Sequence, residues 1–494
     1  MHKGDLEKAT PRVDELPFDS VRKMMSTKHK LADGSTISYT KGALDSILAH
    51  ATKILENGQE RDITDEDIKT IYEANSYFSA KALRVLALSY SKNQAEKMEE
   101  ENLVFVGLVA MIDPARPEAK PAVREFKTAG ITTVMITGDH KDTAFAIAKD
   151  LGICETIDQC MMGGDIDKLT PEELQEVCKT TRVFARVSPE NKVQIVKAFQ
   201  ANGNICAMTG DGVNDAPSLK AADIGIAMGI TGTDVAKGAA DMVLTDDNFA
   251  SIEKAVEEGR GIYANIKKTV IFLLSSNIAE VLAMFFIICI GFPAPLIAIH
   301  LLWVNLITDS LPAIALGMDP KDPNIMKESP RDPNEGIFAN GGLRNTILYG
   351  AIITVAVLLA YFSCGALNLA KEGIDFSFAA VKDLFANNSD ALHEAQTMAF
   401  TTLAFSELFH MAGMSNVNRS VAKIFSNKNK MMLIAFIAGI VLQLIVIEVP
   451  GVSAVFSTHN LSAEEWIITA ILSLVPLFAH EIIVLINWLR NKNK

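Results

Sequence analysis

The residues best suited to chemistry lie in one short turn, Thr209-Gly210-Asp211-Gly212-Val213-Asn214-Asp215. The glycines on either side of Asp211 let the backbone approach a phosphate closely. Two carboxylates and an amide supply the oxygen ligands that Mg²⁺ prefers. The turn therefore predicts phosphoryl-transfer chemistry at Asp211, Asn214 and Asp215.

Two further elements of the same chemistry precede this turn. Thr137-Gly138-Asp139 follows an apolar run and places a hydroxyl and backbone N–H groups where a phosphate can be held. Lys192 lies at a helix start after Ser188-Pro189-Glu190 and can neutralise a phosphoryl group. Each element alone is a common turn or a solvated lysine. Together, in this order and spacing, they are typical of a haloacid-dehalogenase-like phosphotransferase.

A second polar set lies within the apolar C-terminal half. Its members are Asn277, Glu280, Asn305, Thr308, Asp309 and Glu407. Residues three or four apart share a helix face, and ionisable groups are costly in lipid, so the carboxylates are functional candidates. Hydrogen bonding between helices is the alternative, and it suits Asn277 and Thr308 better than the carboxylates. Oxygen ligands of this kind favour Ca²⁺ over a soft transition metal.

Alternating β-rich and helical stretches must position the first set. Predicted strands are residues 103–112, 132–136 and 205–208, and the helices between them are 118–129, 142–151 and 191–201. This alternation predicts a parallel α/β sheet. Runs at 35–39 and 84–89 predict strands of a separate small α/β domain. We therefore expect domains at 1–100, 101–262 and 263–494.

Six apolar runs must position the second set: 269–290, 296–316, 343–364, 397–413, 431–449 and 466–489. Each is near the ~20 residues that span a bilayer, although the fourth is short and more polar. Lys and Arg are concentrated in the loops at 319–331 and 418–430 and in the tail at 490–494. This distribution predicts six transmembrane helices in a cell membrane, with both termini cytoplasmic. Residues 250–268 contain no proline and predict a helix leading towards Glu280.

Composition agrees with segregated soluble and membrane parts. The chain has 494 residues, of which 49% are hydrophobic and 21% charged, and it is too long for one ordinary domain. The formal net charge of -13 argues against a nucleic-acid partner. The six cysteines form no CxxC pair, which indicates reduced thiols rather than a disulfide framework.

Several separated motifs identify a resemblance. They are FDSVRKMM at 18–25, YTKGA at 39–43, DPARP at 113–117, MITGD at 135–139, FARVSPENK at 184–192 and MTGDGVNDAP at 208–217. From Leu16 onward the chain resembles the C-terminal half of a P-type ATPase, closest to the calcium pumps of the sarcoplasmic-reticulum type. The resemblance implies an ATP- and Mg²⁺-dependent pump that exports Ca²⁺ through an aspartyl-phosphate.

The resemblance also implies roles for individual residues. The implied nucleotide site consists of Phe18, stacking on adenine, with Lys23, Lys41, Arg84 and Arg186. Ser20 stands where the animal pumps carry an arginine. The implied catalytic set consists of Thr137, Gly138, Asp139, Lys192, Asp211 as Mg²⁺ ligand, Asn214 and Asp215. Asn277, Glu280, Asn305, Thr308, Asp309 and Glu407 coincide with calcium-coordinating positions of that family.

The family's phosphorylated aspartate is not among these residues, because Asp-Lys-Thr-Gly-Thr occurs nowhere in the sequence. We expect its strand to belong between those at 132–136 and 205–208. Two interpretations follow. The chain is part of a longer calcium pump, or it is an inactive membrane remnant or half-pump that needs the missing N-terminal part as a separate chain. Mn²⁺ and Na⁺ remain alternative cargoes.

Overall fold

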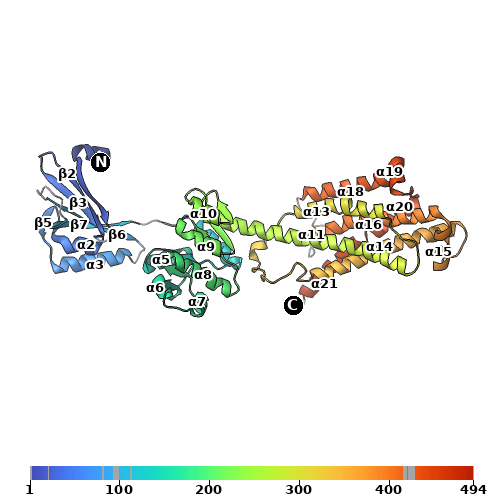
Figure 1. The fold of residues 1–494 in the computed structure, drawn as a ribbon, viewed down its shortest axis with the longest axis horizontal. Helices are drawn as coiled ribbons and strands as arrows, with labels where there is room; N and C mark the ends of the chain where they lie inside the picture. The colour runs from blue at the N-terminus through green and yellow to red at the C-terminus, as the bar shows by residue number, and fades with distance from the viewer. Residues whose placement is uncertain are drawn as a thin grey trace. The chain divides into compact units, whose positions relative to one another are not determined.

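A computed structural model describes residues 3–19, 22–79, 83–92, 100–111, 114–415, 420 and 429–492. Ser20 and most of the predicted loop 418–430 lie outside the described residues. The chain divides into two compact units, residues 1–253 and 254–494. Each unit is described by itself (Figure 1).

The first unit begins with a seven-stranded sheet in the order β1-β2-β3-β6-β7-β4-β5. Its elements are α1 (Lys3–Ala9), β1 (Arg12–Asp19), β2 (Met24–Lys30), β3 (Thr36–Gly42), α2 (Leu44–His50), β4 (Ala51–Glu56), β5 (Gln59–Asp62), α3 (Asp65–Ser79), β6 (Arg84–Ser91) and β7 (Leu103–Met111). Helices α2 and α3 pack against the sheet. The core between them includes Met24, Ile47 and Phe105. Tyr39 and Val106 are exposed.

Strand β7 differs from the sequence-based assignment. The predicted strand at 103–112 belongs to the expected domain at 101–262, whereas β7 pairs antiparallel with β6 and parallel with β4 in the first sheet. The first sheet therefore extends to Met111, beyond the expected domain boundary at residue 100. Apolar character predicts a buried strand, but it does not say which sheet the strand joins.

Two parallel three-stranded sheets follow, in the orders β8-β10-β9 and β11-β12-β13. Their strands are β8 (Met135–Ile136), β9 (Cys160–Met162), β10 (Val183–Ala185), β11 (Ala207–Gly210), β12 (Ile224–Met228) and β13 (Met242–Leu244). Their helices are α4 (Ala119–Thr128), α5 (Lys141–Leu151), α6 (Gly163–Ile166), α7 (Pro171–Cys178), α8 (Pro189–Ala201), α9 (Ala216–Ala221) and α10 (Asp234–Ala239). Parallel pairing confirms the predicted α/β character of this region.

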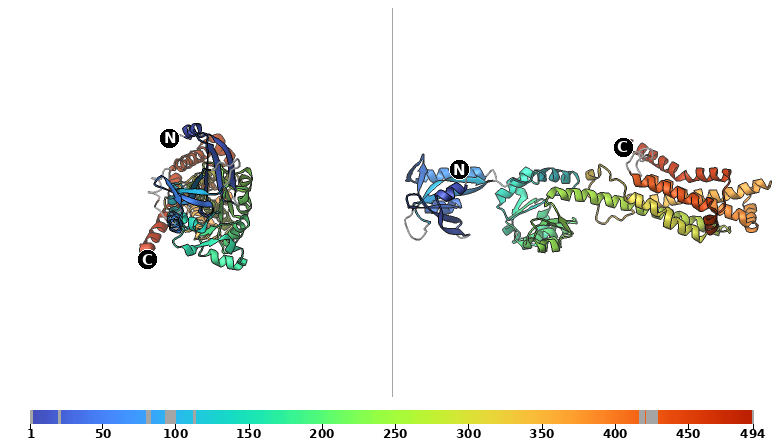
Figure 2. Two further views of the ribbon diagram at one scale, coloured as in Figure 1. Left: turned by 90° about the vertical axis from the view of Figure 1, so that its left-hand side faces the viewer. Right: turned by 90° about the horizontal axis from the view of Figure 1, so that it is seen from above.

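Helix α11 (Phe249–Cys289) begins just before the second unit, whose regular elements among the described residues are all helices. Its other elements are α12 (Ala298–Trp303), η3 (Val304–Thr308), α13 (Ser310–Gly317), η4 (Ile325–Lys327), α14 (Gly342–Lys371), α15 (Phe378–Asn387), α16 (Ser389–Ser415), α18 (Lys430–Glu448), α19 (Pro450–Phe456), α20 (Ala463–Ser473) and α21 (Val475–Lys492). The long helices run side by side in Figure 1 and in the right-hand view of Figure 2. The predicted helix at 250–268 is thus confirmed as part of α11.

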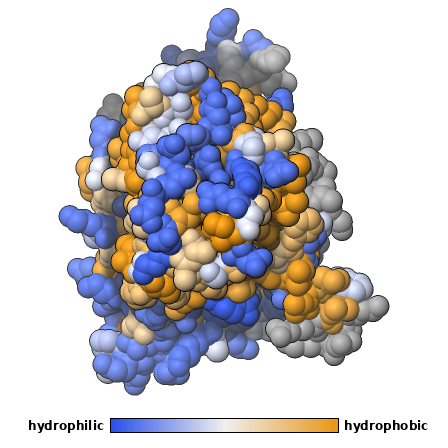
Figure 3. Space-filling view, turned by 90° about the vertical axis from the view of Figure 1, so that its right-hand side faces the viewer, coloured by the Kyte–Doolittle hydropathy of each residue, from blue (hydrophilic) through white to orange (hydrophobic). Residues whose placement is uncertain are grey.

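Five helical segments of the described residues are long and apolar enough to cross a membrane. They are Phe249–Cys289, Ala298–Gly317, Gly342–Lys371, Lys430–Glu448 and Ala463–Leu489. Large apolar side chains such as Val281, Leu302 and Ile471 are exposed on them, as expected for surfaces that contact lipid. Figure 3 shows the face that lies on the right-hand side of Figure 1. Hydrophilic residues gather near the centre of this face, and apolar residues lie around them.

The fourth predicted span differs from the other five. It corresponds to α16, which is long but is not among the segments apolar enough to cross by composition. Helix α16 lies against α13, α14, α18, α20 and α21, and nearly all its residues from Ala395 to Ser415 are buried. Because protein rather than lipid surrounds α16, its polar side chains can be satisfied by neighbouring helices.

Candidate functional site

The predicted phosphoryl-transfer residues lie directly after β8, in the first turn of α8 and directly after β11. Ser188 caps helix α8, and its side chain accepts from the N–H of Asn191, which starts the helix where the sequence predicts. Lys192 then lies in the first turn, and its Nζ donates to Asp215 Oδ1 at 2.5 Å. Oδ2 of Asp215 accepts from the N–H groups of Gly212 at 3.0 Å and Asp211 at 3.2 Å.

These contacts keep Asp215 charged. Burial raises its pKa, but the hydrogen bonds from Lys192 and from the Gly212 and Asp211 N–H groups lower the pKa below its usual value. Asp215 is buried, whereas Asp211 and Asn214 are exposed at the same turn. The turn therefore combines a fixed carboxylate with two accessible oxygen-bearing side chains, an arrangement able to bind Mg²⁺.

The Thr137 turn is joined to the Arg186 turn by backbone hydrogen bonds. Thr137 Oγ1 donates a hydrogen bond to Asp139 Oδ2 at 3.2 Å and accepts one from the N–H of Asp139 at 3.1 Å. The N–H of Arg186 donates to Asp139 O at 3.1 Å, and the N–H of Val187 donates to Thr137 O at 3.2 Å. A Cβ at Gly138 would meet nothing within 4 Å, so this turn is open.

Asp247 is a positioning residue that the sequence analysis missed. Its carboxylate accepts from the N–H groups of Gly229 at 2.6 Å, Ile230 at 2.9 Å and Thr231 at 2.7 Å, and from the Thr231 hydroxyl at 2.8 Å. Burial raises its pKa, but these donors hold the pKa at about 2. The loop that Asp247 organises reaches the Asp211 turn, because Thr233 N donates to Asp211 O at 2.8 Å. The available signal was the run Asp246-Asp247-Asn248, which begins two residues after the end of β13.

Three of the predicted nucleotide residues lie near one another on the first sheet. Phe18 on β1 is 65% exposed. Lys41 on β3 pairs with Met25 on β2, and the exposed Lys23 precedes that strand. Arg84 is exposed at the start of β6, but Lys41 pairs with Leu88, four residues away. Arg84 is therefore offset from Lys41 by about 13 Å along the strand.

The predicted cation ligands converge from α11, the α12–η3–α13 segment and α16. Asn305 Nδ2 donates to both oxygens of Glu280, at 3.1 and 3.0 Å. Thr308 Oγ1 donates to Val304 O at 3.0 Å and to Glu407 Oε2 at 3.5 Å. Asn277, one turn before Glu280, instead donates to Leu273 O of its own helix at 2.7 Å.

A local change of helix type places Asp309 in this group. The segment η3 is a π-helical turn, and the N–H of Asp309 donates to Val304 O, five residues back, at 2.9 Å. Pro312 in α13 has no N–H to donate to Thr308 O. Such turns are frequent at functional sites because they rotate side chains and free carbonyl oxygens. The backbone before Pro312 thus departs from α-helical geometry in a π-turn.

Three carboxylates of this group are buried without a positive partner. Glu280, Asp309 and Glu407 are 6%, 1% and 0% exposed, and none forms an ion pair with any described residue. Both oxygens of Asp309 and Oε1 of Glu407 also lack a hydrogen bond there. Oxygen atoms of these three carboxylates do not all lie within 4.8 Å of one another. Among the described residues, the group of His, Cys, Asp or Glu side chains that meets this distance is a different one.

Comparison with known families decides the classification. Residues 1–118 match the family described as "P-type ATPase, cytoplasmic domain N", and residues 293–486 match "Cation transporting ATPase, C-terminus". This chain belongs to the P-type ATPases. This membership and the five apolar helices indicate a multi-pass membrane protein.

Several relatives of this P-type ATPase chain are named as calcium pumps. Calcium-transporting ATPase 1 of Bacillus cereus is 49% identical over 98% of this chain and 54% of its own length. Calcium-transporting ATPase of Bacillus subtilis is 41% identical over 94% and 51%. The human calcium-transporting ATPase type 2C member 1 is 37% identical over 91% and 46%. The chain thus spans about half the length of the curated relatives it matches.

Proposed function

We propose that this chain is the C-terminal part of an ATP-driven pump that exports Ca²⁺ from the cytosol. The observation that carries the proposal is the group of buried carboxylates, Glu280, Asp309 and Glu407, without a positive partner. Isolated buried charges are strongly unfavourable unless a cation compensates them. Carboxylate, amide and hydroxyl oxygens match Ca²⁺, and the names of the relatives agree. Mn²⁺ and Na⁺ are the alternative cargoes.

The soluble unit would supply phosphoryl-transfer chemistry. In this proposal Phe18, Lys23, Lys41, Arg84 and Arg186 bind ATP, Asp211 holds Mg²⁺, and Lys192 contacts the transferred phosphoryl group. Thr137, Gly138 and Asp139 offer donors beside it, while Asn214 and Asp215 complete the pocket. The residues fit the metal because the exposed Asp211 carboxylate accepts no hydrogen bond from the described residues. Bound Mg²⁺ would neutralise phosphate charge during transfer.

The aspartate that accepts the phosphoryl group would enter on one more strand. Strands β8 and β11 are each the edge of a three-stranded parallel sheet. Ile136 of β8 packs against the core cluster that contains Met208 of β11, so the two edges belong to one core. We infer that a parallel strand carrying the aspartate pairs between them. It would come from the remainder of a longer chain or from a separate chain.

We further infer six membrane crossings, with α16 as the sixth and both termini on the cytoplasmic side. Support comes from the burial of α16 among candidate spans. The loops at 364–392 and 450–464 contain two lysines and no arginine, whereas Lys and Arg are frequent at 319–331 and in the tail. Positive charge favours the cytoplasmic side. The site of action would be the cell membrane.

The cation-binding part is tested by equilibrium binding of radioactive Ca²⁺ to the purified chain in detergent. Glu407→Gln should abolish saturable binding, because it removes a buried ligand charge, whereas Glu372→Gln, at an exposed position, should bind as the wild type does. Competition with Mn²⁺ and Na⁺ identifies the preferred cargo. Saturable binding that survives in both Glu407→Gln and Asp309→Asn contradicts the proposal.

The catalytic part is tested by acyl-phosphate formation from radiolabelled ATP. The chain alone should form none, since the acceptor motif is absent from its sequence. Co-expression with a polypeptide carrying the upstream strand should restore an acid-stable phosphoprotein that Lys192→Gln weakens. A phosphoprotein formed by the chain alone would show that another residue accepts the group.

A further inference from the structure

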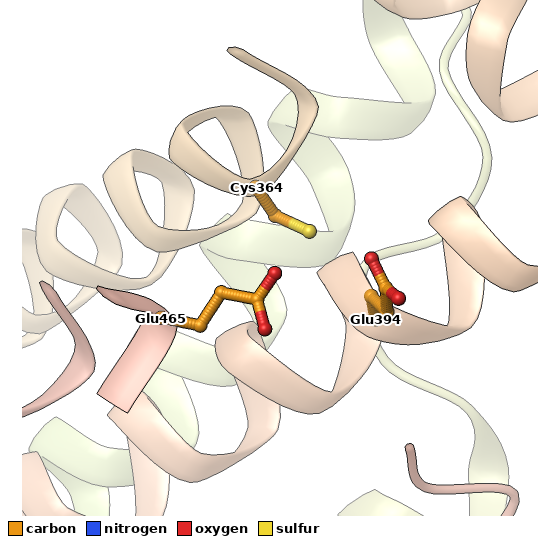
Figure 4. Close-up of side chains that lie close together, drawn as sticks. All are labelled: Cys364, Glu394 and Glu465. Atoms are coloured by element: carbon orange, nitrogen blue, oxygen red, sulfur yellow. The ribbon is translucent and has the colours of Figure 1, made fainter. Parts of the chain in front are cut away.

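Three side chains from three helices meet inside the second unit, apart from the predicted transport set. They are Cys364 of α14, Glu394 of α16 and Glu465 of α20 (Figure 4). The Cys364 Sγ atom and one carboxylate oxygen of each glutamate all lie within 4.8 Å of one another. Cys364 is 0% exposed and Glu465 is 2% exposed, while Glu394 is partly buried.

Glu465 has a carboxylate oxygen that lacks a donor. Its Oε2 accepts from the N–H of Ser462 at 2.7 Å and caps α20, but its buried Oε1 has no hydrogen bond among the described residues. Figure 4 shows this carboxylate directed towards Cys364 and Glu394 rather than away from them. Its ion-pair partner, Lys371, is 3.7 Å from Oε1 and 54% exposed. A buried acceptor left in this state is costly unless a ligand completes it.

Asn368 of α14 orients the other two members. Its Nδ2 donates to Glu394 Oε2 at 2.9 Å and lies 3.5 Å from Cys364 Sγ. Hydrogen bonds of this kind from neighbouring side chains typically fix the ligands of protein metal sites. The cluster therefore has three convergent ligand atoms and a residue that holds two of them in place.

We propose that Cys364, Glu394 and Glu465 bind a divalent metal of the Zn²⁺ type. One sulfur and two oxygen ligands suit Zn²⁺ and leave a further position for water, whereas a thiolate disfavours Ca²⁺. On binding, the S–H bond of Cys364 breaks, a sulfur–metal bond forms and the proton leaves to solvent. One thiolate, two carboxylates, the Lys371 ammonium and a divalent ion then sum to zero charge.

This site is separate from the predicted transport set. Glu394 and Glu407 are both on α16, thirteen residues apart, which corresponds to about 20 Å along a helix. The three ligands come from three different helices, so a bound metal would tie α14, α16 and α20 together. We therefore assign the site a role in restraining the bundle, independent of the cargo.

The test is a Co²⁺ and Zn²⁺ titration of the full chain, stripped of metal and held reduced in detergent. Co²⁺ should produce the near-ultraviolet absorption of a cobalt–thiolate bond with one equivalent per chain, and Zn²⁺ should remove it. Millimolar Ca²⁺ should leave it unchanged. Cys364→Ser should abolish the band, Asn368→Ala should weaken binding by about 10–100-fold, and Cys289→Ser, at an exposed cysteine, should have no effect.

The outcomes separate the alternatives. Absence of a thiolate band in the wild type, or a band that survives in Cys364→Ser, overturns the proposal. Displacement of Co²⁺ by Ca²⁺ at equal potency also overturns it, since the site would then be an unselective acidic cluster. If Cys364→Ser does not fold, the wild-type titration together with Glu465→Gln decides, because loss of the one-equivalent Zn²⁺ binding in that variant is required.

Discussion

At the scale of single residues, the predicted phosphoryl-transfer site depends on one ion pair whose two members come from separate elements. Lys192 belongs to the first turn of α8 and Asp215 to the turn after β11. The hydrogen bond keeps a buried carboxylate charged, and that charge would otherwise be unfavourable. Stability of this region should therefore vary with pH in a way that depends on Lys192.

We expect Lys192→Gln to destabilise the region around β11 and α9 by about 1.5–3 kcal/mol at neutral pH, the usual worth of a hydrogen bond to a charged group. The folded-state pKa of Asp215 is lowered, so its stabilisation is present above the unfolded value of about 3.9 and is lost as the pH falls through the folded pKa. The difference between variant and wild type should shrink on acidification.

Hydrogen exchange measured by mass spectrometry, corrected for the intrinsic effect of pH, checks this expectation in peptides covering β11 and α9. Lys197→Gln, at an exposed position of the same helix, is the matched control and should exchange like the wild type. A Lys192→Gln effect of equal size at pH 7 and at pH 3 would contradict the electrostatic explanation.

At the scale of elements, local patterns were predictable and long-range pairings were not. The start of α8 was predictable because Ser188 and Pro189 determine it within one turn. The partners of β7 were not, because an apolar strand can join either neighbouring sheet. Likewise, Glu280, Asp309 and Glu407 could be proposed from their cost in lipid, whereas the Cys364 cluster depends on three helices distant in sequence.

A close approach between α14 and α11 should control the geometry of the predicted cation ligands on α11. A Cβ at Gly350 would meet two atoms of α11, Ile278 Cγ2 at 2.6 Å and Ser275 O at 3.1 Å. Ile278 directly follows Asn277 and lies two residues before Glu280. Gly350→Ala should therefore displace α11, weaken Ca²⁺ binding and cost about 1–3 kcal/mol of stability through overpacking. Ca²⁺ binding and thermal unfolding in detergent measure the two effects.

The matched control for this experiment lies in α11 itself. A Cβ at Gly259 would meet nothing within 4 Å, so Gly259→Ala should stabilise the helix by up to about 1 kcal/mol and leave Ca²⁺ binding unchanged. Equal Ca²⁺ affinity in Gly350→Ala and Gly259→Ala would show that this helix contact does not set the ligand geometry.

At the scale of the whole molecule, α11 is the element shared by the two compact units. It is one continuous helix from Phe249 to Cys289, although it contains Gly259 and Gly261. Glu280 lies on the same helix. Continuity of α11 is our hypothesis for how phosphoryl transfer and cation release are coupled.

A glycine pair inserted after Ala264 should uncouple the complete pump, because it interrupts the helix between the soluble unit and Glu280. ATP hydrolysis should continue while Ca²⁺ uptake into vesicles falls, so the ratio of uptake to hydrolysis is the measurement. The same pair inserted after Gly373, an open position with positive φ outside the helices, should leave the ratio unchanged. An unaltered ratio with the first insertion would count against the helix as the coupling route.

The burial of α16 has a consequence for biosynthesis. The translocon allows each newly made segment to partition between water and lipid. Charged residues near the centre of a helix oppose the insertion of that helix into lipid. Helix α16 carries Glu407 there and contacts protein on nearly all sides once the bundle is complete. Its partition into the bilayer should consequently depend on α14, which is synthesised before it, and on α18, which follows. A nascent chain that stalls before α18 should then leave α16 outside the lipid, exposed to quality-control proteases.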